Sequence, residues 1–123
     1  MKYLKKKVGD IPISTVSVVE DGEKASQDII FIHMSWGGVW VYDLYMQFFA
    51  KAGYRCYALD LRGHGESGGS VEGTKMQDYV DDVRTAVVEL GMQNPIVVGH
   101  SMGGLIALMY SAQYGSLATI SLD

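Results

Sequence analysis

Apolar residues occur in short continuous runs that alternate with stretches of helical periodicity. The runs at residues 29–32 and 96–98 are uninterrupted, which is typical of strands buried on both faces of a sheet. At residues 76–90 the apolar positions recur at spacings of three, four and seven, which predicts an amphipathic helix with one buried stripe. Strands and helices that alternate in this way favour an α/β fold built on a layered sheet.

Glycine and proline residues separate the predicted elements. The expected strands cover residues 2–8, 11–19, 29–32, 54–61, 96–98 and 117–122. The expected helices cover residues 40–52, 74–90 and 105–114. Thr74 and Gln77 are expected to form a capping box at the start of the second helix. Its acidic side chains are expected on a solvated face, at Asp78, Asp81, Asp82 and Glu89. Residues 20–28 and the glycine-rich residues 62–73 are expected to be loops.

One predicted turn carries candidate chemistry. Residues 99–103 read Gly-His-Ser-Met-Gly and match G-x-S-x-G, in which a strand turns so sharply into a helix that the central side chain projects above the sheet edge. The flanking glycines remove Cβ atoms that would collide, and the central residue is strained. We therefore expect Ser101 to be an exposed nucleophile, with the N–H of Met102 aimed where an oxyanion would form. The alternative is a glycine-rich helix start packed close to a strand.

Three segments, in this order, resemble the α/β-hydrolase superfamily: residues 29–35, 60–67 and 99–104. The resemblance extends over residues 11–123 and implies a three-layer α/β/α fold around a mostly parallel sheet. The segment at Ser101 is similar to that of monoacylglycerol-lipase-like and lysophospholipase-like esterases. The resemblance thus implies a serine hydrolase of carboxylic esters that works through an acyl-enzyme on Ser101.

The resemblance also implies two backbone N–H groups that bind the oxyanion. One belongs to Met102, and the other to Ser35 in the loop after the third strand. A His-Gly pair normally precedes this second donor, but here His33 is followed by Met34, which leaves Met34 as the alternative donor. His33 itself is structural in the family. No cofactor and no metal are expected, because the acidic side chains pair with no His or Cys at ligand spacing.

The residues that would activate Ser101 are not identifiable. The order in this fold is nucleophile, acid, histidine, yet all three histidines precede Ser101, and the 22 residues after it contain none. Asp123 is a candidate for the acid, since some branches place it after the sixth strand. We expect residues 1–123 to be a single partial domain, the N-terminal half, truncated after about the sixth strand and lacking the cap. The alternative to an incomplete esterase is a catalytically inactive half-domain that acts as a structural or interaction module.

Composition narrows the expected partners. The chain is 48% apolar and 20% charged, which excludes a disordered chain, and its net charge of −4 argues against nucleic acid. The single cysteine, Cys56, cannot form an internal disulfide. No apolar run approaches the roughly 18 residues of a membrane span. We expect a cytoplasmic protein that takes a small ester substrate and whose open sheet edge favours self-association or a complementing C-terminal half.

Two further patterns have competing interpretations. Residues 63–68 match G-x-G-x-x-G, but a dinucleotide site needs these glycines to open a helix directly, and the next helix is expected only near Thr74. We therefore expect no nucleotide, and expect Asp60, Arg62 and His64 to fix this loop near the site. Trp36 and Trp40 are either core residues or part of a pocket wall.

Overall fold

The computed structural model describes residues 1–22 and 25–123. Its strands are β1 Lys2–Val8, β2 Ile13–Val19, β3 Gln27–Ile32, β4 Tyr54–Leu59, β5 Ile96–His100 and β6 Ala118–Leu122. Its helices are α1 Asp43–Lys51, α2 Met76–Glu89 and α3 Met102–Tyr114, and a 3-10 turn, η1 Val39–Tyr42, precedes α1. Each expected strand and helix therefore forms, with ends that differ by a few residues.

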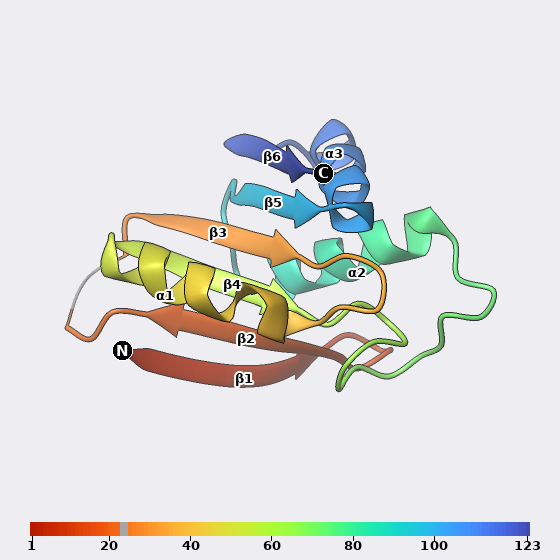
Figure 1. Cartoon of the computed structure of the whole chain (residues 1–123), viewed down its shortest axis with the longest axis horizontal. Helices are drawn as coiled ribbons and strands as arrows, with labels where there is room; N and C mark the ends of the chain where they lie inside the picture. Colours follow the sequence, from red (N-terminus) through yellow and green to blue (C-terminus); the bar gives the residue numbers. More distant parts are fainter. Residues whose placement is uncertain (23–24) are drawn as a thin grey trace.

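The strands form one sheet in the order β1-β2-β4-β3-β5-β6 (Figure 1). The neighbours β4, β3, β5 and β6 run parallel, whereas β1 and β2 form a hairpin that pairs antiparallel with β4. The mostly parallel sheet is thus confirmed. Because parallel strands end at a common edge, the loops that follow β3, β4 and β5 meet there.

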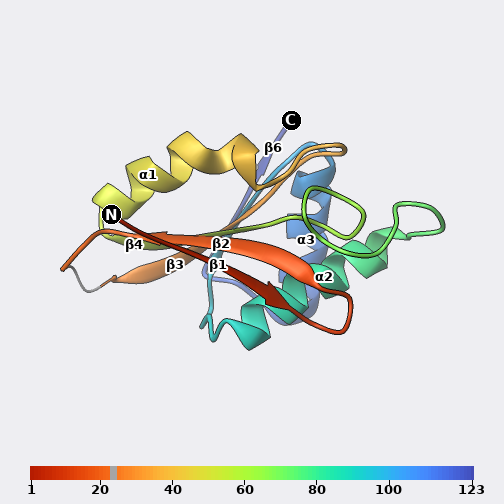
Figure 2. The same ribbon diagram turned by 90° about the horizontal axis from the view of Figure 1, so that it is seen from below.

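The helices cover both faces of this sheet. Helix α1 lies on one face, and α2 and α3 lie on the other (Figure 2). Successive residues of each central strand alternate between the two resulting cores: Val97 packs in the α2–α3 core and Val98 in the α1 core. This arrangement is the expected three-layer α/β/α architecture, and it explains why the central strands are apolar without alternation.

Helix α1 and η1 bury only part of their apolar surface. Tyr42, Met46 and Ala50 face the sheet, whereas Leu44, Tyr45 and Phe48 are more than half exposed. Because apolar residues lie on both sides of this helix, the sequence pattern does not predict which side faces the sheet. The outer side chains form an exposed apolar surface.

Two local expectations were wrong. The capping box does not involve Thr74 and Gln77: the N–H of Lys75 donates to the carboxylate of Asp78 at 2.8 Å, because α2 begins one residue later than the pattern suggested. The hydroxyl of Thr74 instead donates to the Ser70 carbonyl. The loop expected over residues 20–28 is shorter, since β3 begins at Gln27; residues 23 and 24 of it lie outside the described residues.

Candidate active site

Ser101 joins β5 to α3 in a strained backbone conformation, with φ 55° and ψ −118°. Non-glycine residues rarely adopt a positive φ, and such outliers persist only where the surroundings enforce them. Here the N–H of Ser101 donates to the Leu122 carbonyl at 2.7 Å, and the Ser101 carbonyl accepts from Gly104 at 2.9 Å. Ser101 is exposed at the edge of the sheet where the parallel strands end. This is the geometry expected of the turn.

Glycines make this turn possible through close backbone packing. A Cβ atom on Gly99 would collide with the backbone of Gly103, and one on Gly103 would collide with the carbonyl oxygens of Ile32 and His33. The start of α3 is therefore pressed directly against the end of β3. This contact brings the loop after β3 beside Ser101.

The predicted oxyanion donors lie at this junction. The hydroxyl of Ser35 donates to the Met102 sulfur at 3.2 Å, so the loop after β3 touches the first residue of α3. The backbone N–H of Met102 has no intrahelical acceptor, because the first N–H groups of a helix point beyond its end. Met34, the alternative donor, accepts the N–H of Gly37 on its carbonyl at 3.0 Å and so opens a tight turn. The donor roles remain predictions.

His33 is a structural residue, as the resemblance implies. Its ring is fully buried; Nε2 accepts the N–H of Leu61 at 3.0 Å, and Nδ1 donates to the Met34 carbonyl at 2.7 Å. Burial lowers the pKa of His33, which keeps the ring neutral. His64 packs against it with ring centroids 4.9 Å apart. Among the described residues, no histidine is hydrogen-bonded to the Ser101 hydroxyl.

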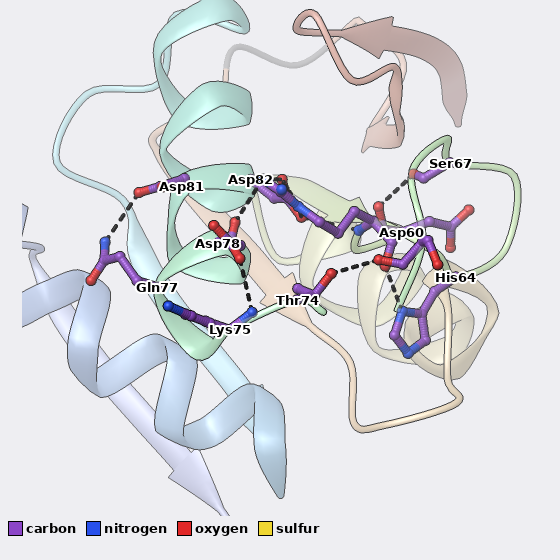
Figure 3. A network of polar contacts seen from close by, with 11 residues as sticks. Asp60, His64, Ser67, Thr74, Lys75, Gln77, Asp78, Asp81 and Asp82 are labelled. Carbon is purple, nitrogen blue, oxygen red and sulfur yellow. Dashed lines mark hydrogen bonds and ion pairs between the residues drawn. The ribbon is translucent and has the colours of Figure 1, made fainter. Parts of the chain in front are cut away.

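The loop after β4 is held by buried carboxylates (Figure 3). Asp60 is 2% exposed; it accepts the N–H of Glu66 on its side chain and the Ser67 hydroxyl on its carbonyl. Arg62 donates its backbone N–H and its guanidinium to Asp82, which is 3% exposed. Asp82 was expected on a solvated face, and that expectation was wrong, because the partly exposed side chain of Arg62 lies over this part of α2 and pairs with it at 2.8 Å.

Several other expected residues can now be placed. The glycine-rich residues 63–68 form an irregular loop, and α2 starts only at Met76. These glycines therefore do not open a helix, as a dinucleotide-binding motif would require. Trp36 and Trp40 are 79% and 67% exposed, so neither is a core residue. Asp123 is exposed directly after Leu122, the residue whose carbonyl accepts the N–H of Ser101. Asp123 therefore lies at the same sheet edge as Ser101.

Known proteins share these features. A family model described as alpha/beta hydrolase fold matches residues 29–119, which include the loop after β3 and the turn at Ser101. The chain belongs to the alpha/beta hydrolase family. A CIB-like hydrolase of Thermoplasma acidophilum has this fold at 21% identity, with a TM-score of 0.83 over 98% of this chain and 62% of its own.

More similar relatives of this alpha/beta hydrolase carry enzyme names. A bifunctional esterase/perhydrolase of Acinetobacter calcoaceticus is 43% identical over 89 residues, or 70% of this chain and 32% of the relative. A monoacylglycerol lipase of Mycolicibacterium smegmatis is 47% identical over 73 residues, or 55% of this chain and 26% of the relative. A carboxylesterase structure from Nitrososphaera gargenis is 33% identical with a TM-score of 0.79, over 96% of this chain and 44% of its own. The chain spans about a third of the length of the first curated relatives.

No helix that the structure describes is both long enough and apolar enough to cross a membrane.

Proposed function

We propose that this chain supplies the nucleophile and the oxyanion-binding backbone of a serine hydrolase that acts on carboxylic esters. The observation that carries the proposal is the strained backbone of Ser101 between β5 and α3. This turn holds a serine at the N-terminus of a helix, where partial positive charge favours a developing oxyanion. Relatives named as an esterase/perhydrolase, a monoacylglycerol lipase and a carboxylesterase support carboxylic esters as the substrate class.

The proposed reaction proceeds through an acyl-enzyme. The Ser101 oxygen attacks the ester carbonyl carbon, and the N–H groups of Met102 and Ser35 stabilise the negative charge on the carbonyl oxygen. The alcohol leaves with the proton of the hydroxyl, and water then releases the acid and regenerates Ser101. Hydrogen peroxide in place of water would release a peracid, an alternative favoured by the esterase/perhydrolase relative.

We propose that neither His33 nor His64 is the base for Ser101. His33 already uses both ring nitrogens, one as acceptor from Leu61 and one as donor to Met34. His64 donates Nδ1 to the Arg62 carbonyl and packs behind His33. An unassisted serine hydroxyl is a weak nucleophile. We therefore expect this chain alone to react slowly, and to react faster when a polypeptide that carries a histidine and an acid completes the site. A cytoplasmic location remains part of this proposal.

The test is labelling of the chain with a fluorophosphonate probe, with Ser101→Ala and Ser111→Ala compared in parallel. Ser111 is a matched control, since it lies on the same helix but is hydrogen-bonded to Thr119 and Ser116. We expect slow labelling of the wild type and of Ser111→Ala, and none of Ser101→Ala. Equal labelling of all three proteins would remove the nucleophile assignment.

The edge of β6 supports a second candidate function, an interaction module that pairs with a second copy of the chain. Within the described residues β6 pairs with β5 alone, and Ile120 and Leu122 are more than two-fifths exposed. These side chains line a cavity of about 270 Å³ beside Tyr45 and Phe49 of α1. Residues 118–122 carry no charge, whereas the opposite edge strand carries four lysines, a charge pattern that deters edge pairing.

Sedimentation equilibrium discriminates this second candidate from the first. If β6 pairs with another copy, the chain dimerises, Ile120→Lys weakens the dimer at least tenfold, and Tyr3→Lys on the β1 edge leaves it unchanged. A monomeric wild type, or equal effects of both variants, would rule out the module. Labelling of Ser101 is read separately, so each candidate can fail alone.

A further inference from the structure

The loop after β3 contains a second strained residue. Trp36 has a positive φ of 61° and lies third in the turn that the Gly37 N–H closes onto the Met34 carbonyl at 3.0 Å. Ser35, the second residue of this turn, has no positive φ, so the turn has the type II pattern, whose third position favours glycine or asparagine. A bulky tryptophan there is disfavoured. The surroundings therefore have to hold the turn in this shape.

Both ends of this loop are tied to the two residues that follow β4. At its start, the Leu61 N–H donates to Nε2 of His33, and Nδ1 of His33 donates to the Met34 carbonyl. At its end, the N–H of Val39 donates to Oδ1 of Asp60 at 2.9 Å. The second oxygen of Asp60 accepts the Glu66 N–H at 3.0 Å, so this carboxylate joins the loops after β3 and β4.

Close packing fixes the position of the Asp60 carboxylate between the two loops. A Cβ atom on Gly65 would collide with the Asp60 carboxylate, and one on Gly38 would approach its Oδ1 at 3.0 Å. Asp60 is 2% exposed, so water does not replace its hydrogen bonds. Bonds from a buried carboxylate to backbone N–H groups are among the stronger ones in proteins. The loop end at Val39 is thus fixed relative to the end of β4.

We propose that Asp60 is a positioning residue that holds the strained turn at Trp36, and with it the Ser35 backbone, against the start of α3. The inference rests on the proposed function, because its purpose is the alignment of an oxyanion donor. Asp60 acts through the N–H of Val39 and touches no substrate. Trp36 is 79% exposed, and its ring is tilted against that of His64 with the ring centroids 6.0 Å apart, so its own packing contributes little to holding the turn.

The test compares Asp60→Asn with Asp82→Asn, each in the full chain. Asparagine can accept through only one of its two terminal atoms, so one of the two backbone donors to position 60 loses its partner. Asp82 is an equally buried carboxylate whose partner is Arg62 and not the loop after β3, which makes it the matched control. Trp36 and Trp40 are the two tryptophans of the chain, so a Trp40→Phe background leaves Trp36 as the fluorescent reporter of the turn.

We expect Asp60→Asn to lower the fluorescence anisotropy of Trp36 and to slow phosphonylation of Ser101 at least tenfold, at a temperature where circular dichroism shows folded protein. Asp82→Asn changes both readouts less than twofold. Trp36→Asn removes the strain, because asparagine tolerates a positive φ. In that background Asp60→Asn slows phosphonylation less than threefold.

Equal effects of Asp60→Asn and Asp82→Asn, or a full effect of Asp60→Asn in the Trp36→Asn background, would overturn the inference. If wild-type Ser101 is not labelled, the proposed function fails, and the anisotropy of Trp36 still decides the role of Asp60. If Asp60→Asn does not fold, the decisive variant is Trp36→Asn alone. A higher urea midpoint supports the strained turn, and an unchanged or lower midpoint contradicts it.

Discussion

Gly103 offers a sharp test of how α3 meets the sheet, because two physical effects predict opposite signs. Gly103 is the second residue of α3. In an open helix, replacing glycine by alanine stabilises the folded state by about 1 kcal/mol, since glycine loses more backbone entropy. At Gly103 a Cβ atom would collide with the carbonyl oxygens of Ile32 and His33. These atoms belong to the end of β3 and cannot rotate away.

The collision is large enough to decide the sign. To relieve it, α3 has to move away from β3 by on the order of an ångström, which opens gaps in a close-packed core. Overpacking of this kind costs about 1–3 kcal/mol, which exceeds the gain from helix propensity. Because the added Cβ atom would meet backbone oxygens that cannot move aside, the cost lies in the upper half of this range, about 2–3 kcal/mol. After the helix gain of about 1 kcal/mol is subtracted, we expect Gly103→Ala to lower the free energy of unfolding by about 1–2 kcal/mol. The same movement carries the N–H of Met102 out of line with Ser35, so phosphonylation of Ser101 slows as well.

Urea unfolding followed by circular dichroism measures the first effect, and Gly104→Ala supplies the contrast. A Cβ atom on Gly104 meets chiefly the hydroxyl of Ser121, which is a side chain. Combining Gly104→Ala with Ser121→Ala should therefore restore wild-type stability, and no such rescue exists for Gly103→Ala. If Gly103→Ala is as stable as the wild type or more stable, α3 does not press on the end of β3 and the reasoning about this junction is wrong.

Three further predictions concern buried ionisable groups. Burial lowers the pKa of His33, so below pH about 6.5 the unfolded chain binds a proton that the folded chain does not. The free energy of unfolding should therefore fall as the pH is lowered below about 6.5, and the fall should be smaller in His33→Gln. Asp82→Ala removes the carboxylate partner of Arg62, whose side chain is partly exposed, and should lower the free energy of unfolding in urea by about 1–3 kcal/mol, whereas Asp81→Ala on the exposed side of α2 should leave it unchanged. Burial raises the pKa of Cys56 to about 12, so iodoacetamide should alkylate it slowly in the native protein and rapidly in urea.

The sequence was most informative where one short segment determines its own structure. The turn at Ser101 needs glycines on both sides of the serine, an apolar strand before it and an apolar helix after it, and all of these can be read locally. The sequence pattern was wrong where the burial of a side chain depends on a partner that is distant in the sequence. Asp82 looks like any other acid on the polar side of α2, and only the path of the loop after β4 brings Arg62 to it.

Helix α1 shows a different limit of the sequence pattern. Apolar residues occupy most of its circumference, and such a helix can bury either side. The strand order decides the face: β4 and β5 lie on opposite sides of β3, so the right-handed connections through α1 and α2 run in opposite directions and lie on opposite faces of the sheet. Met46 and Ala50 of α1 therefore pack on the sheet.

The core between α1 and the sheet does not account for the apolar side chains on the outer side of α1. Leu44, Tyr45 and Phe48 remain exposed, and Tyr45 lines the cavity that Ile120 and Leu122 also line. Single apolar residues scattered on a surface are normal. A continuous apolar surface that joins a helix to a sheet edge across one cavity, in contrast, is typical of an interaction site. A polypeptide that pairs with β6 would therefore also cover α1. Consequently Phe48→Lys should weaken any such association as Ile120→Lys does, whereas a variant on the far sheet edge, Tyr3→Lys, should not. If Phe48→Lys associates as the wild type does while Ile120→Lys is weakened, the outer side of α1 is not part of the surface that β6 uses.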